Sequence, residues 1–306
     1  MDDIQKYDFE SSDDQNVNNS GTTATANESA DTQTNVGIAS VRTDPNIPRD
    51  DAPIVVLVGP PQSGKSMVLK CLADYLHKAD SRCTIEANRN LFDDDEYQAN
   101  CNTFEALIGE TYKKMPNTIN FLMVDLIDRN GNTVAHFLEA PGEDYFSLDD
   151  SDQEPQRGFP GYMNSIAQID DDHPRKVVYV IILDLDSDTP FRRHIKLKEK
   201  YTKKMKKLYQ IYVVNHPAEV ILLYNKADIP HDAKWANSAG INNLTKLYDD
   251  AHGEYGNLFF TKRFLFWEIS AVQFVPFCTG YYSGDQYNSP DPSYPKALWK
   301  AIKKSW

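Results

Sequence analysis

The fold is decided by one stretch, Pro53-Ile-Val-Val-Leu-Val-Gly59-Pro-Pro-Gln-Ser-Gly64-Lys65-Ser66. Its apolar start has the length and composition of a buried strand. The loop that follows satisfies the pattern G-x-x-x-x-G-K-[ST] at Gly59, Gly64, Lys65 and Ser66. Apolar residues then recur at helical spacing. A strand, a glycine loop and a helix in this order predict a phosphate-binding loop.

This pattern binds phosphate because successive N–H groups curl around an anion and the following helix points its positive end at it. Lys65 is expected to reach the β- and γ-phosphates, and the Ser66 hydroxyl to bind Mg²⁺. Pro60 and Pro61 have no N–H, so the cradle falls to the residues after them. The amides expected to hold phosphate are those of Gln62, Ser63, Gly64, Lys65, Ser66 and Met67. The alternative interpretation is a glycine and serine turn with an incidental lysine.

Composition limits the class of protein. The 306 residues are 41% hydrophobic and 25% charged, enough for one large domain or two small ones. There is no run of 18 apolar residues and no signal-peptide pattern at the start, so we expect a cytoplasmic protein without a membrane span. The formal charge of −13 argues against nucleic acid as a partner. The four cysteines lack metal-type spacing and are expected to be reduced thiols.

Residues 1–49 differ from the rest of the chain. They are rich in Asp, Asn, Ser and Thr, and nine acidic and three basic residues give them a formal charge of −6. Such a segment buries too little apolar surface to offset the entropy lost on ordering. We therefore predict a disordered acidic tail, 1–49, and a folded domain, 50–306. The tail is interpreted as a solubilising arm, with docking to a partner as the alternative.

The folded part alternates apolar runs with amphipathic segments. Strands are predicted at 54–58, 121–128, 133–139, 177–183, 220–224 and 264–269, and helices from the phosphate loop to about 80, then at about 103–114, 189–213, 239–252 and from 295. Asn130-Gly131 between two strand-like runs predicts a hairpin. The result is an α/β fold, with a mainly parallel six-stranded sheet, one antiparallel strand and helices on both faces. Residues 88–100 and 274–292 are expected to be loops.

Three further motifs follow the phosphate loop in order. They are Glu139-Ala-Pro-Gly142, Asn225-Lys226-Ala-Asp228 and Ser270-Ala271. With the loop, they resemble the D-x-x-G, N-K-x-D and S-A-x motifs of Ras-like GTPases of the translation-factor-related (TRAFAC) class, over residues 53 to about 306. Some bacterial GTPase families associated with multi-component systems have a similar D/E-x-P-G-E segment. The resemblance implies a P-loop NTPase fold, GTP or GDP as ligand and Mg²⁺ as cofactor.

The N-K-A-D segment is the candidate for reading the base. The Asp228 carboxylate can accept hydrogen bonds from the N1–H and the exocyclic amine of guanine, whereas adenine offers the wrong groups there. The resemblance implies that Asn225 braces the loop and that Lys226 lies along the base. It also implies that Ser270 and Ala271 bring an amide to the guanine oxygen. A surface loop after a strand is the alternative interpretation.

Three residues are candidates for hydrolysis, namely Lys65 of the phosphate loop, Gly142 and Glu143. Gly142 is expected to offer its amide to the γ-phosphate, because glycine allows close approach. Glu143 stands where many relatives have a glutamine that orients water. A catalytic role for Glu143 and an exposed position on a loop are both open. No arginine finger is evident, so turnover without an activator is expected on the order of 10⁻⁴ to 10⁻² s⁻¹.

The expected Mg²⁺ ligands are Ser66, Thr118 and Glu139. Glu139 stands where the family has an aspartate, and a longer carboxylate can hold the ion through water. Thr118 is the candidate for the threonine of the first switch, and Thr103 and Thr111 are the alternatives.

The predicted helix at 189–213 carries nine basic residues. We interpret them as a solvated face, with an acidic partner, the tail or anionic lipid as alternative ligands. The expected function is a Mg²⁺-dependent GTPase that switches shape and acts on an unidentified effector or activator. The alternatives are a nucleotide-binding scaffold with little hydrolysis, and a P-loop ATPase or kinase.

Overall fold

The computed structural model describes residues 45–59, 63–79, 83–110, 122–139, 166, 174–184, 191–214, 218–227, 244–264, 266–283 and 286–306. All of them belong to one compact unit, 41–306. Predictions made for 1–44 lie outside these ranges. So do those for Gln62, Thr111, Thr118, Gly142, Glu143 and Asp228.

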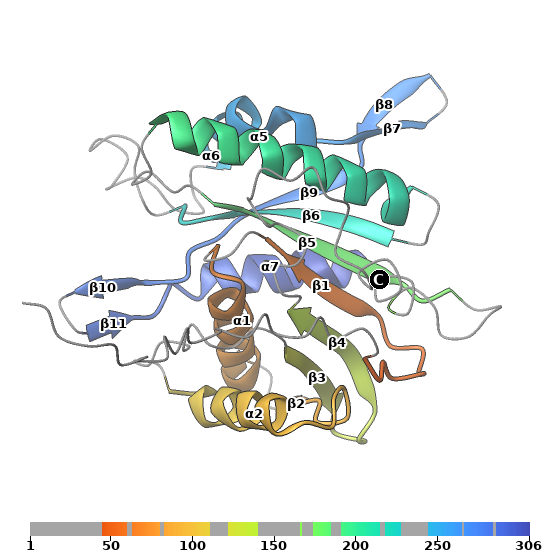
Figure 1. The fold of residues 1–306 in the computed structure, drawn as a ribbon, viewed down its shortest axis with the longest axis vertical. Helices are drawn as coiled ribbons and strands as arrows, with labels where there is room; N and C mark the ends of the chain where they lie inside the picture. The colour runs from red at the N-terminus through yellow and green to blue at the C-terminus, as the bar shows by residue number, and fades with distance from the viewer. Residues whose placement is uncertain are drawn as a thin grey trace, which may run out of the picture. The chain divides into compact units, whose positions relative to one another are not determined.

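A seven-stranded sheet forms the centre of this unit (Figure 1). Its strands are β1 (Ile54–Val58), β2 (Cys83–Ala87), β3 (Leu122–Asp128), β4 (Thr133–Glu139), β5 (Val177–Asp184), β6 (Ala218–Asn225) and β9 (Val272–Pro276). The strand order is β2-β3-β4-β1-β5-β6-β9. β3 is antiparallel to both of its neighbours, and the other adjacent pairs are parallel. The mainly parallel sheet with one antiparallel strand is confirmed.

The predicted number of six strands is wrong, because β2 was not recognised. This strand lies at the edge of the sheet. Its polar residues Thr84 and Glu86 are exposed and alternate along the strand with the half-buried Cys83 and Ile85. A five-residue edge strand with two outward polar residues has no continuous apolar run to reveal it.

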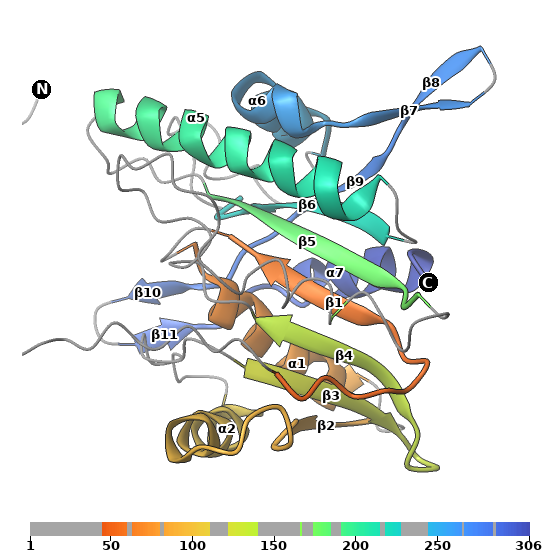
Figure 2. The same ribbon diagram turned by 45° about the vertical axis from the view of Figure 1, so that its right-hand side comes forward.

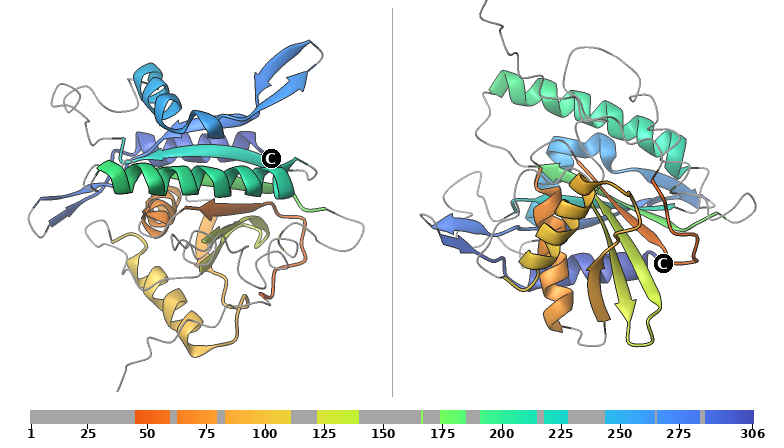
Figure 3. Two further views of the ribbon diagram at one scale, coloured as in Figure 1. Left: turned by 45° about the horizontal axis from the view of Figure 1, so that its top comes forward. Right: turned by 60° about the horizontal axis from the view of Figure 1, so that its bottom comes forward.

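The helices lie on both faces of the sheet, as predicted (Figure 2). They are α1 (Lys65–Ala79), α2 (Asp95–Leu107), α5 (Phe191–Leu208), α6 (Leu244–Tyr255) and α7 (Ser293–Lys304), with a π-helical turn η1 (Tyr209–Val213) and a 3-10 turn η3 (Gly256–Leu258). Figure 3 shows α5 on one side of the sheet and α7 on the other. None of the helices that the structure describes has the length and apolar character needed to cross a lipid bilayer.

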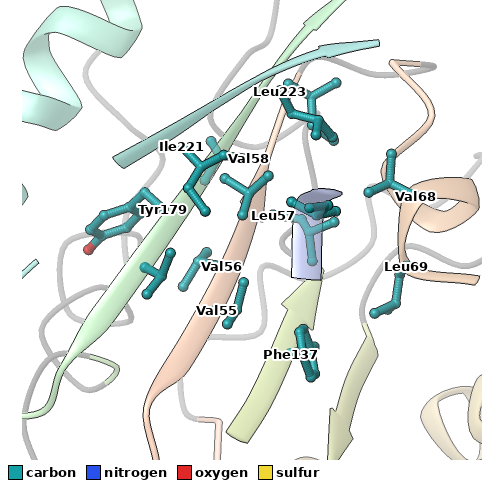
Figure 4. Packing of buried hydrophobic residues seen from close by; sticks show 14 of the residues in the cluster. Val55, Val56, Leu57, Val58, Val68, Leu69, Phe137, Tyr179, Ile221 and Leu223 are labelled. Atoms are coloured by element: carbon teal, nitrogen blue, oxygen red, sulfur yellow. The ribbon is translucent and has the colours of Figure 1, made fainter. Parts of the chain in front are cut away.

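The core is built around β1, whose five residues are all buried. Neighbouring strands and the phosphate-loop helix cover it (Figure 4). The side chains that pack there include Val68 and Leu69 of α1, Phe137 of β4, Tyr179 of β5, and Ile221 and Leu223 of β6. A strand covered on both faces has a continuous apolar sequence, which is why 54–58 was recognisable.

The predicted hairpin is present between β3 and β4. Gly131 has a φ of +82°, a conformation that glycine adopts without steric cost. The Asp128 Oδ1 atom accepts hydrogen bonds from the backbone N–H of Asn130 at 2.8 Å and of Asn132 at 2.9 Å. Hydrogen bonding from Asn132 lowers the pKa of Asp128. The turn is therefore held by its own local contacts.

The prediction that 264–269 forms a strand of the main sheet is wrong. Those residues contribute to a two-stranded antiparallel hairpin outside the main sheet, β7 (Thr261–Phe264) and β8 (Trp267–Ser270). The edge of the main sheet is formed instead by β9, so the expectation of a loop at 274–292 is wrong at 274–276. A second hairpin, β10 (Tyr281–Ser283) and β11 (Gln286–Asn288), follows it.

The expected loop at 88–100 contains the start of α2, which begins at Asp95 rather than near Thr103. Asp94 caps this helix, since its Oδ1 atom accepts a hydrogen bond from the Tyr97 N–H at 2.8 Å. The run of acidic residues predicts an exposed loop. It is a capped helix start, where negative side chains complement the helix dipole.

Residues 45–49, which composition assigned to the tail, contact the domain. The Asn46 N–H donates to the Leu91 carbonyl at 2.9 Å. The buried Arg175 guanidinium donates to the carbonyls of Pro48 and of Asp50. The segment before β1 is therefore ordered against the sheet, four residues or more ahead of the predicted boundary.

Candidate nucleotide-binding site

The strands that carry the motifs end at one edge of the sheet. β1 pairs in parallel with β4 and β5, and β5 pairs in parallel with β6. Leu57 lies opposite Glu139, and Asp184 lies opposite Asn225. The phosphate loop, Glu139 and Asn225 therefore leave the sheet together, at the carboxyl edge where open α/β sheets bind ligands.

Two glycines let the loop fold tightly over this edge. A Cβ atom on Gly59 would lie 2.4 Å from the Ser63 Oγ atom and 3.2 Å from the Ile182 Cβ atom. Gly64 has a φ of +88°, and a Cβ atom there would lie 2.8 Å from the Asn225 Nδ2 atom. Neither position has room for a side chain.

Asn225 joins the phosphate loop to the end of β6. Its Nδ2 atom donates to the Ser63 carbonyl at 2.9 Å, and both residues are fully buried. The contact links two motifs that are 162 residues apart in the sequence. The asparagine of the N-K-A-D segment thus lies against the loop.

Two polar atoms at this contact lack a hydrogen-bond partner within the described part of the chain. They are the Ser63 hydroxyl oxygen and the Asn225 Oδ1 atom, and both are buried. Buried polar groups without partners are rare because they are costly, and each calls for an explanation. A bound ligand that offers hydrogen-bonding groups at the loop would satisfy them.

Lys65 is the first residue of α1 and is buried. Its Nζ atom donates to the Gly59 carbonyl at 3.2 Å, so the ammonium group lies across the loop. The first turn of α1 carries no acidic residue. The positive end of the helix dipole and the Lys65 ammonium therefore both favour an anion at the start of α1. Met67, the last residue of the expected cradle, lies in the same turn.

Ser66 and Glu139 lie in direct contact. The Ser66 Oγ atom donates to the Glu139 Oε1 atom at 2.6 Å, and Glu139 is buried. A hydroxyl and a carboxylate are hard oxygen ligands, which Mg²⁺ prefers, and this ion usually takes only one or two carboxylates with phosphate and water. The pair fits such an ion. Over the described ranges, no group of three or more His, Cys, Asp or Glu side chains could hold a metal.

The segment after β6 is tied to the segment after β9. The Phe277 N–H donates to the Tyr224 carbonyl at 2.8 Å, and the Ala227 N–H donates to the Phe277 carbonyl at 2.9 Å. Lys226 has a φ of +56°, which turns the chain sharply at this point. Asp228, one residue beyond Ala227, lies outside the described residues.

Sequence reasoning missed the part of the site that follows β9. A Cβ atom on Gly64 would lie 3.9 Å from the Thr279 Cγ2 atom. The Cys71 Sγ atom of α1 is 3.9 Å from the Thr279 carbonyl. Gly280 follows with a φ of +87°. A threonine and a glycine directly after an apolar run were the available signal, and Pro276 inside that run obscured it.

Ser270 and Ala271 do not lie at this site, contrary to expectation. Val272 pairs with Val220 at the start of β6, and the two strands run in parallel. Ser270 and Ala271 precede β9 and therefore lie toward the amino edge, away from Asn225. The physical reason is that the sheet strand begins after them rather than ending before them.

Of the three threonines that are candidates for the first switch, the structure describes Thr103. Thr103 lies inside α2, where its Oγ1 atom donates to the Ala99 carbonyl at 2.8 Å. That hydroxyl is thus used within its own helix. Thr111 and Thr118 lie outside the described residues.

Neither a protein-family model nor a curated protein matches the chain. Among solved structures it is similar to a nucleolar GTP-binding protein 1 from Plasmodium falciparum, with 14% identity, a TM-score of 0.35 and coverage of 85% of this chain and 89% of that one.

Two further structures are similar over much of this chain. One is Roco2 RocCORdC of Methanosarcina barkeri bound to GDP, with 14% identity, a TM-score of 0.32 and coverage of 83% of this chain. The other is the Ski7 GTPase-like domain of S. cerevisiae bound to GTP, with 15% identity, a TM-score of 0.36 and coverage of 84%. The chain spans 50% and 51% of their lengths.

Proposed function

We propose that this chain binds a guanine nucleotide with Mg²⁺, hydrolyses GTP to GDP and changes shape between the two states. The observation that carries the proposal is the 2.9 Å hydrogen bond from Asn225 to the Ser63 carbonyl. It brings the candidate phosphate loop and Asn225, the first residue of the N-K-A-D segment, to one edge of the sheet. A nucleotide has a phosphate end and a base end, and these two motifs suit one each.

The loop supplies the phosphate end. The amides of Ser63, Gly64 and Lys65 lie at the start of α1, where the helix dipole favours an anion. The Lys65 ammonium, now 3.2 Å from the Gly59 carbonyl, exchanges that carbonyl for phosphate oxygens. The Ser63 hydroxyl gains a partner in the same step.

The segment after Asn225 supplies the base end in this proposal. Asp228 follows Ala227, which is fixed to Phe277 by a backbone hydrogen bond. A carboxylate held there accepts from the two guanine N–H groups. A base that lacks these donors leaves the carboxylate desolvated and unpaired, so it binds much more weakly.

Hydrolysis needs positioning and charge stabilisation rather than covalent chemistry. Mg²⁺, when bound, neutralises charge between the phosphates, and Ser66, Glu139 and Thr118 are its proposed ligands. The Gly142 amide holds the γ-phosphate and Glu143 orients the attacking water. An activator protein supplies the missing cation in trans, and an effector protein reads the change of shape.

A scaffold that binds nucleotide without cleaving it is the second candidate. The observation that favours it is the short contact between Ser66 and the buried Glu139. A carboxylate already hydrogen-bonded to the serine must reorient before both can serve the same ion. Measuring cleavage separates the two candidates.

Single-turnover phosphate release with Mg²⁺ is the first test. We expect slow release from GTP that stops when Mg²⁺ is chelated. Tight GTP binding with no release above background over hours would favour the scaffold. Competition against labelled GDP tests the base: GTP displaces it and ATP does not. Equal displacement by ATP would favour the P-loop ATPase or kinase.

A further inference from the structure

The hairpin formed by β7 and β8 projects beyond the main sheet (Figures 1 and 2). At its tip, Phe266 is 91% exposed and Trp267 is 73% exposed. The sequence around the tip is Phe264-Leu-Phe-Trp267, four large apolar residues in a row. Two aromatic side chains held in water at the end of a hairpin arm are an unusual surface, because apolar groups of this size are normally buried.

Basic residues stand directly behind this tip. Lys262 is exposed in β7, and Arg263 lies opposite Glu268 in the strand register. A strand rises about 3.3 Å per residue, so Lys262 lies roughly 10 to 15 Å behind the apolar end. An apolar tip with a cation one or two residue pairs behind it has the layering of a membrane–water interface.

Further lysines lie next to the base of the hairpin. The ring of Tyr209, the first residue of η1 directly after α5, stacks on the Phe260 ring with centroids 3.7 Å apart, and Phe260 immediately precedes β7. In the last two turns of α5, Lys203 and Lys207 are exposed. The basic end of α5 and the aromatic hairpin are therefore neighbours.

We propose that this surface, the β7–β8 hairpin together with the carboxyl-terminal turns of α5, docks on anionic lipid bilayers. Phe266 and Trp267 enter the interface between headgroups and acyl chains. Lys262, Lys203 and Lys207 face the negatively charged headgroups. Weak apolar insertion and weak charge attraction reinforce each other, as peripheral membrane anchors require.

Two other occupants fit less well. A second copy of the chain needs about 800 Å² per partner for a stable interface, whereas two aromatic side chains bury at most about 400 to 500 Å². The chain's own acidic segment, 1–49, complements the lysines in charge but has few large apolar groups to cover Phe266 and Trp267. A lipid surface accommodates both features.

The acidic residues of α6 limit how the surface can be oriented. Glu254 forms an ion pair with Lys198, in which the Nζ and Oε2 atoms are 2.7 Å apart. Asp249 and Asp250 lie on the same helix without a comparable basic pair among the hydrogen bonds of the described residues. An orientation in which Asp249 and Asp250 do not face the anionic bilayer would avoid their repulsion from it.

Co-sedimentation of the full chain with vesicles tests the proposal. The vesicles contain phosphatidylcholine alone or with about one-third phosphatidylserine, to set a negative surface potential. We expect binding to the anionic vesicles that weakens with added salt. The double variant Phe266→Ser, Trp267→Ser should bind at least about tenfold more weakly, because the tip no longer buries apolar area. Lys203→Glu with Lys207→Glu should weaken binding as well.

The matched control is Leu244→Ser, which removes an apolar side chain that is 49% exposed on α6. This variant should bind like the wild type. Lys65→Ala should also bind vesicles normally, so failure of the nucleotide proposal is distinguishable from failure of this one.

Three results would overturn the proposal. One is no binding of the wild type to either kind of vesicle. Another is undiminished binding by the Phe266→Ser, Trp267→Ser variant. The third is a combined result in which light scattering shows a wild-type dimer, the variant is a monomer, and vesicles do not bind the wild type. That result would assign the hairpin to self-association.

Discussion

Asn225 is the residue at which the two halves of the proposed site meet. Its side chain fills the space beside Gly64, where a methyl group would lie only 2.8 Å from the Asn225 Nδ2 atom. Because the amide is buried and bonded to the Ser63 carbonyl, the loop cannot shift without breaking that bond. The position of the phosphate cradle is thus set by a strand from the other half of the sheet.

Gly64→Ala should displace this cradle. The substitution places a methyl group against Asn225 and forces a left-handed backbone on alanine, at a cost of about 1 to 2 kcal/mol. We expect nucleotide affinity to fall at least about tenfold, which corresponds to about 1.4 kcal/mol. Titration with labelled GDP measures the loss.

Gly131→Ala is the control for this substitution. Gly131 has a similar φ of +82° but no heavy atom within 4 Å of the added Cβ atom. This variant should lose a similar amount of stability from backbone strain and bind GDP normally. Equal GDP affinities for the two variants would show that the contact with Asn225 does not matter.

His136 is the centre of a second buried network, at the amino end of β1. Its Nδ1 atom is 2.6 Å from the Asp125 Oδ1 atom, and its Nε2 atom is 3.0 Å from the Asp50 Oδ1 atom. Burial by itself lowers the pKa of His136, but hydrogen bonds and charges from Asp125 and Asp50 outweigh it, and the net pKa is raised. The charged imidazole therefore holds the segment before β1 on the sheet.

The network should make stability depend on pH. Since the pKa of His136 is higher in the folded state, its stabilisation is complete below the unfolded value of about 6.5 and is lost as pH rises through the folded value. His136→Gln should cost about 2 kcal/mol at pH 6 and less at pH 9. Urea unfolding at several pH values checks this. A cost that is constant with pH would contradict a charged imidazole.

At the scale of elements, α2 shows why part of the fold could not be predicted. Its acidic start has the composition of a solvent-exposed loop, and only the contact of Asp94 with the Tyr97 N–H reveals a helix cap. Tyr97 is also anchored by its hydroxyl, which donates to the Asn88 carbonyl at 2.6 Å. Such contacts depend on where β2 and β3 lie, which no local pattern encodes.

Asp94→Ala should remove the cap of α2. We expect a loss of about 1 kcal/mol in the free energy of unfolding, because an orphan N–H loses its acceptor. Asp93→Ala removes the same charge one residue earlier, where the side chain is exposed. Chemical denaturation of both variants measures the difference. Equal losses would assign the effect to charge rather than to the cap.

The edge strand illustrates a second limit of prediction. Both 264–269 and 272–276 are apolar enough to form a strand. The choice between them is made by pairing with β6, where Val272 to Pro276 fit beside Val220 to Tyr224. Pro276 is tolerated because β9 is an edge strand. Propensity alone could not rank the two runs.

The candidate site was predictable where its motifs are local. Gly59 to Ser66 reveal the phosphate loop because a strand and a helix flank them directly in the sequence. Asn225 was recognisable from the apolar run before it. Thr279 and Gly280 were not, because their place depends on which strand occupies the edge of the sheet. The prediction put the edge strand at 264–269 instead of 272–276, and it therefore put Ser270 and Ala271 at the wrong edge of the sheet.

At the scale of the whole domain, the two edges of the sheet carry different features. The carboxyl edge holds the phosphate loop and Asn225, with β10 and β11 beyond it, whereas β7 and β8 lie toward the amino edge (Figure 1). The proposed nucleotide site and the proposed membrane contact therefore lie on separate surfaces. Variants of Phe266 and Trp267 should leave GDP affinity unchanged, and a titration with labelled GDP checks this.

The central claim is that the phosphate loop and the N-K-A-D segment grip one guanine nucleotide. The most direct measurement compares the affinities of the wild type and of Asp228→Asn for GDP and for xanthosine diphosphate. Xanthine replaces the exocyclic amine of guanine with a carbonyl, which an amide side chain can meet and a carboxylate repels. We predict that the wild type prefers GDP and that Asp228→Asn prefers the xanthine nucleotide. An unchanged preference for GDP in the variant would contradict the claim.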